Sequence, residues 1–139
     1  MEYQFERVEG SDQQIKVLYQ LLSKRAYSIS HTSMPAYNDH KNFVKNHPYL
    51  DWFIVKSDQD YLGSFYIKHD NSIGLNLTVI NIEIVSASID FIKNCFRPLE
   101  SQASMVSKYF YVNVSASNEE LIAVMRSLDT SQIQISFKL

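Results

Sequence analysis

The chain has 139 residues, of which 45% are hydrophobic and 20% charged, and its formal net charge is −2. This length predicts one domain, residues 1–139, with a core of its own, and the near-neutral charge without a basic block excludes a general nucleic-acid binder. One cysteine excludes an intrachain disulfide, and no apolar run reaches the roughly 18 residues that span a membrane, so we expect a cytoplasmic protein without a membrane partner.

The first third of the sequence predicts one strand and two helices. Tyr3–Val8 alternates between apolar and polar residues, which is typical of a strand. A capping box that begins at Ser11 predicts a helix to about Lys24. After a predicted loop, Pro35 suits the first position of a second helix, which Pro48 ends.

Three strands and a helix are expected in the middle of the chain. The strands are rich in aromatic and β-branched residues and are separated by polar turns, which is typical of a meander. They cover Trp52–Lys56, Tyr61–Lys68 and Ile73–Val79. Gly63, within the second of them, predicts a bulge or a close backbone approach. Asn81–Phe96 repeats apolar residues at helical spacing and predicts the third helix.

The last part of the chain predicts two strands around a helix. Tyr109–Val114 is an aromatic strand, a second capping box at Ser117 begins a helix to Leu128, and Gln132–Leu139 alternates almost perfectly. The resulting order is β-α-α-β-β-β-α-β-α-β. This is an α/β fold of the layered α+β kind, with a central, mostly antiparallel sheet and helices on both faces. The regular terminal strand lacks proline, and such an edge favours pairing with a second copy in a homodimer.

Two stretches of the sequence, together with this element order, resemble a known family. The first stretch contains Ile29-Ser-His-Thr-Ser-Met-Pro35, His40-x-x-Phe43-Val44 and His47-Pro-Tyr49-x-x-Trp52-Phe-Ile-Val55. The second contains Leu62-Gly-Ser-Phe-Tyr-Ile67 and, after a tight turn, Ile73-Gly74. Both resemble small bacterial members of the GNAT N-acetyltransferase superfamily, some of which are linked to amino-sugar acylation.

The resemblance implies where acetyl-CoA would lie. In the family, the cofactor occupies a V-shaped opening between the fourth and fifth strands, so its pantetheine arm would pair with the backbone at Leu77 and Val79. The pyrophosphate would lie at the N-terminus of the next helix, where free N–H groups and the helix dipole favour an anion. The further positions that the resemblance assigns to the cofactor are Val85, Ser86, Ala87, Ser88 and Asn118.

The sequence departs from the family pattern at two sites. The pyrophosphate signature, Gln/Arg-x-x-Gly-x-Gly/Ala, falls on Ile82–Ala87, and only its last position fits. Ile82 cannot hydrogen-bond a phosphate, Val85 replaces the glycine, and Glu83 adds a negative charge. Many family members carry a tyrosine in the last helix as the general acid, and the matching position is Met125, which has no proton to give.

His31 is the candidate general base, because its loop borders the acceptor site in the family and an unperturbed imidazole titrates at about pH 6.5. The favoured alternative is a surface or loop-capping histidine. Strand alternation allows Tyr66, Asn76 and Asn113 to line the acceptor cleft, but it equally allows positions under a helix or in solvent. The spacing of the histidines and Cys95 predicts no metal site.

Three functions stay open on the sequence alone. The first is an acyl-CoA-dependent N-acyltransferase that acts on a small amine or amino sugar and has an eroded donor site. The second is a catalytically inactive protein of the same fold that binds a ligand or a protein, so the sequence leaves open whether the chain is an enzyme. The third is a homo-oligomeric structural protein that pairs through a sheet edge.

Overall fold

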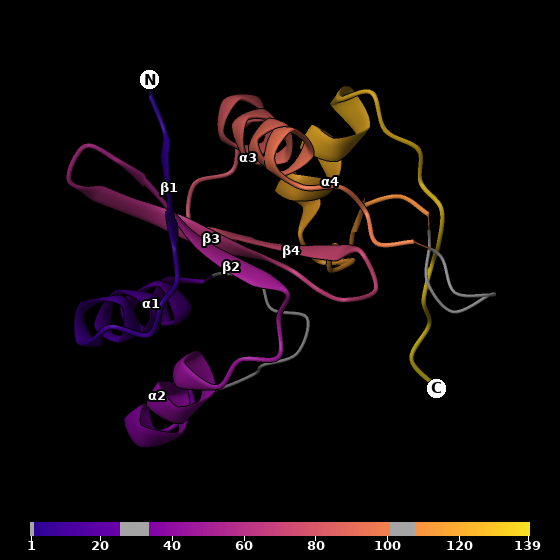
Figure 1. The fold of residues 1–139 in the computed structure, drawn as a ribbon. Coiled ribbons are helices and arrows are strands. Elements are labelled where there is room, and N and C mark those ends of the chain that lie inside the picture. The colour runs from indigo at the N-terminus through magenta and orange to yellow at the C-terminus, as the bar shows by residue number, and fades with distance from the viewer. Residues whose placement is uncertain (1, 26–33, 101–107) are drawn as a thin grey trace.

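A computed structural model, which describes residues 2–25, 34–100 and 108–139, shows a sheet between two pairs of helices (Figure 1). Within these residues the strands are β1 (Gln4–Arg7), β2 (Asp51–Ser57), β3 (Asp60–Ile67), β4 (Ser72–Leu77) and β5 (Tyr111–Val112). The helices are α1 (Asp12–Lys24), α2 (Tyr37–Lys45), α3 (Ile82–Cys95) and α4 (Glu119–Ser127). The predicted order is confirmed from the first strand to the last helix.

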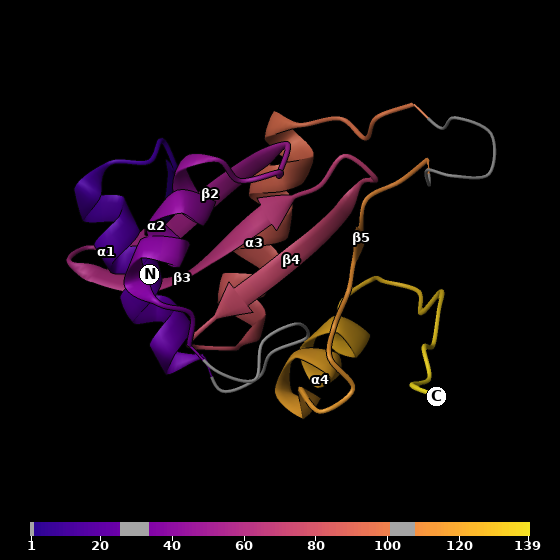
Figure 2. The same cartoon turned by 90° about the horizontal axis from the view of Figure 1, so that it is seen from below.

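The strands form one sheet in the chain order β1-β2-β3-β4-β5, of which Figure 2 shows β2 to β5. Neighbouring strands from β1 to β4 are antiparallel. β5 lies parallel to β4 because the connection between them crosses over through α3. The predicted central, mostly antiparallel sheet is therefore confirmed.

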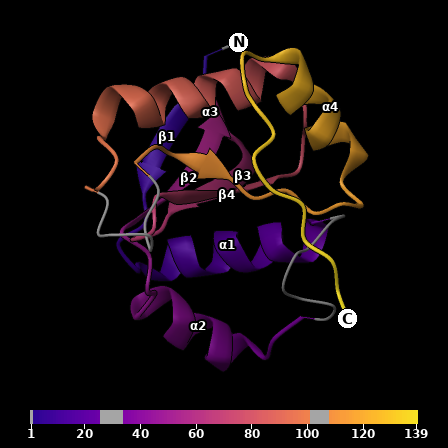
Figure 3. The ribbon, with the colours of Figure 1, turned by 90° about the vertical axis from the view of Figure 1, so that its right-hand side faces the viewer.

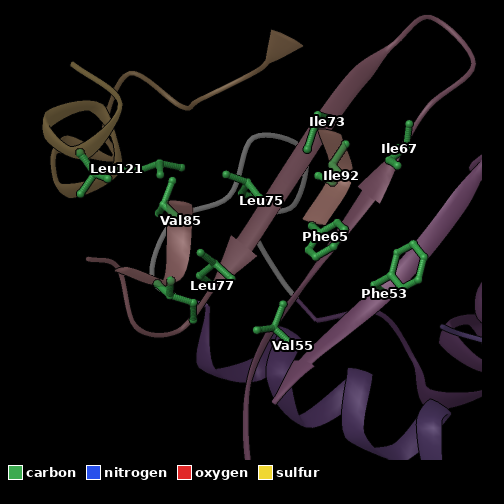
Figure 4. Close-up of a cluster of buried hydrophobic side chains, with 12 residues drawn as sticks. Phe53, Val55, Phe65, Ile67, Ile73, Leu75, Leu77, Val85, Ile92 and Leu121 are labelled. Atoms are coloured by element: carbon green, nitrogen blue, oxygen red, sulfur yellow. The ribbon is translucent and has the colours of Figure 1, made fainter. Parts of the chain in front are cut away.

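Helices α1 and α2 cover one face of this sheet, and α3 and α4 cover the other (Figure 3). Alternation along each strand supplies apolar side chains to both faces. The larger cluster, here called the main core, lies between the sheet and α3 and α4 (Figure 4); its members are Phe53, Val55, Phe65, Ile67, Ile73, Leu75, Leu77, Ile84, Val85, Ile92, Leu121 and Val124. The cluster under α1 and α2 consists of Val8, Ile15, Val17, Leu18, Leu21, Val44, Trp52 and Ile54.

The N-terminus of α1 is capped as the sequence predicts. The Ser11 side chain accepts a hydrogen bond from the Gln14 N–H at 3.2 Å. In return, the Gln14 side-chain carbonyl accepts from the N–H groups of Glu9 and Gly10, at 2.7 and 3.1 Å. The first bond satisfies a backbone donor that the first turn of a helix leaves open, and the other two join the residues before the cap to the helix.

Two other helix starts were predicted at the wrong residue. Helix α2 begins at Tyr37 with Ala36 in the capping position, so Pro35 precedes the helix instead of opening it. Helix α4 is capped by Asn118, whose side chain accepts from the Leu121 N–H at 3.2 Å, and not by Ser117. Asparagine and serine are about equally good caps, so local sequence does not separate the two registers.

Gly63 marks a bulge, as predicted. The register between β2 and β3 shifts between Val55 and Lys56, where Val55 pairs with Gly63. Gly63 has a φ of +147°, and a Cβ atom there would lie 2.5 Å from the carbonyl oxygen of Asn76 on β4. The absent side chain thus lets β3 approach β4 closely.

The predicted terminal strand, Gln132–Leu139, does not form. Its apolar side chains stand in solvent, with Phe137 83% exposed and Ile135 67% exposed. β5, predicted as Tyr109–Val114, is paired only over Tyr111–Val112 and offers a very short edge. Alternation determines which side chains share a face, but a strand also needs a neighbour for its backbone hydrogen bonds, and the structure provides none for this segment.

Candidate functional site: an opening between two parallel strands

The two parallel strands of the sheet pair only where they begin. Ser72 lies opposite Tyr111 and Ile73 opposite Val112. Beyond this point the chain after β5 turns away toward α4, as Figure 2 shows. Leu75 and Leu77 of β4 therefore pair with β3 alone among the described residues. The backbone of β4 is left with hydrogen-bonding groups on this side that a ligand can use.

A small cavity lies at this opening. It has a volume of about 70 Å³, which suits one narrow part of a ligand. Its walls come from the end of α1, from β4 and the connection that follows, and from the start of α4. The lining residues are Lys24, Arg25, Leu75, Asn76, Leu77, Thr78, Ile80, Asn118 and Glu120. Leu77, Asn76 and Asn118, which the sequence assigned to cofactor and acceptor, lie together here.

The start of α3 offers few donors to an anion. The Asn81 side chain accepts from the Ile84 N–H at 2.9 Å, and the Val85 N–H is bonded to the Asn81 carbonyl at 3.2 Å. Glu83 lies in the first turn, where its carboxylate repels a second negative charge. Ile82, which the resemblance places in the Gln/Arg position of the signature, is 54% exposed.

The phosphate contacts expected from the middle of the signature are not available. Helix α3 begins at Ile82, so the N–H groups of Ser86, Ala87 and Ser88 lie inside it and bond to carbonyls four residues earlier. Ser88 is fully buried, and its hydroxyl donates to the Ile84 carbonyl at 2.8 Å. Val85 is also fully buried and lies in the main core (Figure 4), where it neither crowds nor contacts an anion site. The resemblance assigned the phosphate contacts to residues that lie beyond the first turn of α3.

A pair of stacked tyrosines flanks β4 on the α1 face of the sheet. The rings of Tyr49 and Tyr66 lie 4.0 Å apart with an interplanar angle of 7°. Burial raises the pKa of both phenols, and their hydroxyl groups interact electrostatically with Arg25. Burial likewise lowers the pKa of Arg25, although a guanidinium stays charged at neutral pH. Tyr66, a predicted acceptor-cleft residue, thus lies beside the basic end of α1.

The remaining predicted site residues lie elsewhere. Asn113 is exposed, and its N–H donates to the Ile73 carbonyl at 3.4 Å just beyond the paired part of β5. Val79 is exposed in the connection between β4 and α3. Met125 packs against the main core and does not line the cavity. His31 lies outside the described residues.

Sequence reasoning missed three charged residues of the cavity. Lys24 and Arg25 end α1, and Glu120 lies in the first turn of α4. Basic residues at the end of a helix and acidic residues at its start are common for reasons of the helix dipole alone, so no local signal marks them as a site. Their meeting at β4 arises from the tertiary fold.

Within residues 2–25, 34–100 and 108–139, no three His, Cys, Asp or Glu side chains gather as metal ligands would. None of the helices in this part of the chain has the length and apolar character needed to cross a membrane.

Comparison with known proteins gives matches at the level of structure only. The sequence matches no family model and no curated protein. An aminoglycoside acetyltransferase from an uncultured soil metagenomic sample superimposes with a TM-score of 0.63 at 13% identity, over 100% of this chain and 98% of that chain. A second such enzyme, solved in complexes with sisomicin and with trehalose, gives a TM-score of 0.52 at 10% identity, over 99% of this chain and 96% of that chain. The chain therefore has the fold of these acetyltransferases.

Proposed function

We propose that the chain is an acyl-CoA-dependent N-acyltransferase of the GNAT type that acts on a small amine or amino sugar. The observation that carries this proposal is the opening between β4 and β5, because it exposes the backbone of β4 next to a cavity at Leu75–Thr78. The structurally similar proteins are acetyltransferases for amine-bearing sugars, which supports the same class of reaction. The likeness extends over the whole chain.

The reaction is a direct transfer. The backbone of β4 beyond Ile73 would pair with the pantetheine amides of acyl-CoA, and the cavity beside it would receive the thioester. The lone pair of the amine attacks the thioester carbonyl carbon, the tetrahedral intermediate expels the thiolate of CoA, and the proton lost by nitrogen passes to a base or to water. Asn76 and Asn118 supply amide groups beside this path. His31 is the proposed base, and no tyrosine stands at Met125 to protonate the thiolate.

Cofactor affinity and product formation test this proposal separately. Isothermal titration with acetyl-CoA measures the first. The second is best followed by mass spectrometry with sisomicin, glucosamine and spermidine as acceptors, because the exposed thiol of Cys95 would react with thiol reagents that detect free CoA. Asn76→Trp fills the cavity and should abolish both signals. Asn94→Trp, on the exposed side of α3, is the matched control.

A catalytically inactive binding protein is the second candidate, and the start of α3 favours it. There the Ile84 N–H already donates to the Asn81 side chain, and the Glu83 carboxylate repels an anion. The side chain of Ile82 offers no hydrogen bond. Acetyl-CoA binding without product in any acceptor assay would support this candidate. Absence of binding at millimolar acetyl-CoA in well-folded protein would rule out the acyltransferase.

Self-association through the terminal segment is proposed as well. Residues 132–139 keep a strand-like alternation while Ile133, Ile135 and Phe137 are exposed. An extended segment with one apolar face gains backbone hydrogen bonds and apolar burial when it pairs with a sheet edge of a second copy. Light scattering at several concentrations tests the oligomeric state.

A further inference from the structure

The cavity between β4 and α4 is lined by more cationic than anionic side chains. Two cations, Lys24 and Arg25, line it, and Glu120 is the one carboxylate among its lining residues. Lys24 is the last residue of α1 and Arg25 is its C-cap, and the end of this helix places both cations at β4 where the opening lies. The lining therefore carries a net positive charge at neutral pH.

Arg25 is held in a partly desolvated position. Its side chain interacts with the hydroxyl groups of Tyr49 and Tyr66, whose rings are stacked and half-buried. Removing water from a guanidinium strengthens its interaction with an anion, because the surrounding dielectric falls. Lys24, which is exposed, adds a mobile charge at the mouth of the same cavity.

The first turn of α3 carries no cationic side chain that could attract an anion. At the start of α3, the Asn81 side chain already accepts from the Ile84 N–H, and Glu83 contributes a negative charge. An anionic group that enters the opening is therefore attracted to the end of α1 and repelled from the first turn of α3.

We propose that Lys24 and Arg25 form an anion-binding subsite of this cavity, which takes a phosphate or carboxylate group of the bound ligand. The proposal rests on the acyltransferase function for the identity of that ligand. The anion has two sources: the diphosphate of CoA, or an acidic group carried by the amine acceptor. Acceptors with several ammonium groups and no acid are disfavoured by the same pair of cations.

The variants that test the subsite are Arg25→Gln, Arg25→Lys and Lys24→Gln. Lys16→Gln, on the exposed side of the same helix, removes an equal charge far from the cavity and serves as the control. Lys24 is exposed, so its variant should fold even if a change at Arg25 disturbs the stacked tyrosines. Thermal melting of each variant shows which of them are folded.

Isothermal titration with CoA, pantetheine and inorganic diphosphate distinguishes the first source. If the subsite holds the cofactor, Arg25→Gln weakens CoA and diphosphate binding by about tenfold or more, and Lys24→Gln does so to a smaller extent. Pantetheine, which has no phosphate, binds equally well to every variant, and Arg25→Lys keeps part of the affinity. Lys16→Gln behaves as the wild type.

Acceptor competition distinguishes the second source. If the subsite holds an acidic group of the acceptor, the wild type acetylates β-alanine in preference to propylamine, which lacks the carboxylate. Arg25→Gln then loses that preference while its CoA affinity is unchanged.

If the wild type binds CoA and neither measurement responds to either variant, the subsite is refuted and the acyltransferase stands. If the wild type binds no CoA, the acyltransferase fails; diphosphate binding that is lost in Arg25→Gln then supports the subsite, and no diphosphate binding refutes it.

Discussion

The ring of Tyr66 lies directly over the backbone of Gly74, its cross-strand partner on β4. A Cβ atom at Gly74 would be 2.2 Å from the Tyr66 Cζ atom and 2.5 Å from its hydroxyl oxygen. The absence of a side chain at Gly74 thus sets the position of Tyr66, which in turn stacks on Tyr49. A glycine in β4 therefore fixes the tyrosine wall beside the cavity.

Gly74→Ala should consequently displace Tyr66 and lower the free energy of unfolding by about 1–3 kcal/mol, as overpacking in a core does. In a Tyr66→Leu background the same substitution should cost much less, because the clashing ring is gone. Urea unfolding of the two single variants and the double variant measures this coupling. Additive effects would show that the ring and the glycine do not constrain one another.

Asn71 joins three parts of the fold that are distant in sequence. It is fully buried with a φ of +69°, its side-chain amide donates to the Leu99 carbonyl at 3.0 Å, and its carbonyl accepts from the Leu99 N–H at 2.7 Å. Its backbone carbonyl also accepts from Tyr111 in β5 at 3.2 Å. Asn71 thereby attaches both the segment after α3 and the start of β5 to the turn before β4.

Asn71→Ala should lower the free energy of unfolding by about 2–4 kcal/mol, since it removes both side-chain hydrogen bonds to the Leu99 backbone and replaces asparagine, which tolerates a left-handed conformation, by alanine, which disfavours it. Asn71→Gly removes the same side-chain bonds but tolerates that conformation, so it should be less damaging than alanine. Chemical denaturation gives both values. Equal stability of the alanine variant and the wild type would contradict the role assigned to this side chain.

The sequence predicts those elements whose signal is local. Helical spacing over Asn81–Phe96 matched α3 to within one residue at each end, because both an apolar stripe and a cap lie within the segment itself. Gln132–Leu139 failed because alternation says nothing about whether a neighbouring strand exists. The V-shaped opening was expected only through the family resemblance, since the divergence of β4 from β5 is a property of chain segments far apart in sequence.

The same distinction applies to the candidate site. Leu77 and Asn118 were proposed from the resemblance and Asn76 from strand alternation, and the structure brings the three to one cavity. Lys24 and Arg25 could not be proposed, because only the packing of α1 across the sheet brings its last residues to the end of β4. The start of α3 was predicted to within one residue, but the resemblance assigned phosphate contacts to Ser86–Ser88, which lie beyond the first turn, where free N–H groups end.

Protein stability should fall as the pH drops below about 6.5, because His40 is buried in a neutral form. Its Nε2 atom lies 2.9 Å from the Ile15 carbonyl oxygen, which requires an N–H there, and desolvation lowers the pKa of the ring. Between the lowered folded pKa and the unfolded value, the unfolded chain binds a proton that the folded chain does not. Stability is thus complete above that window and decreases within it by up to about 1.4 kcal/mol per pH unit.

Urea midpoints between pH 5 and pH 8 measure this slope. His40→Gln, which keeps a donor for the Ile15 carbonyl, should flatten the curve. Burial also lowers the pKa of His47, so part of the slope should persist until both histidines are replaced. A wild-type curve that is flat over this range would show that the folded and unfolded states bind protons equally.

Deleting residues 132–139 should convert a dimer into a monomer without unfolding the chain. The segment contributes exposed apolar side chains and makes only a few side-chain contacts, such as Gln132 to Arg126 at 3.5 Å, so its loss leaves both cores intact. Light scattering should give twice the chain mass of 16.1 kDa for the full chain, and the mass of one shortened chain for the deletion variant. Replacing Ile135 and Phe137 by glutamate should act like the deletion. A full chain that is monomeric at high concentration excludes this form of self-association.

Ile82→Arg should raise the affinity for acetyl-CoA when the diphosphate lies at the start of α3, and leave it unchanged when the diphosphate lies at Lys24 and Arg25. Ile82 is the first residue of α3 and is exposed, so an arginine there meets no packing obstacle, and the family resemblance places it where the signature carries Gln or Arg. A hydrogen bond to a charged group is worth about 1.5–3 kcal/mol, which corresponds to an affinity gain of roughly 10–150-fold. Isothermal titration measures the gain, and pantetheine, which lacks phosphate, should bind the variant and the wild type alike.

Val85→Gly would also restore the signature but should behave in the opposite way. Val85 is fully buried in the main core, so removing its side chain leaves a cavity and places a glycine inside a helix, at a cost of about 2–4 kcal/mol. This variant should lose stability without gaining acetyl-CoA affinity, because position 85 does not face an anion. A gain in affinity from Val85→Gly and none from Ile82→Arg would show that the cofactor approaches α3 by a different route from the one proposed.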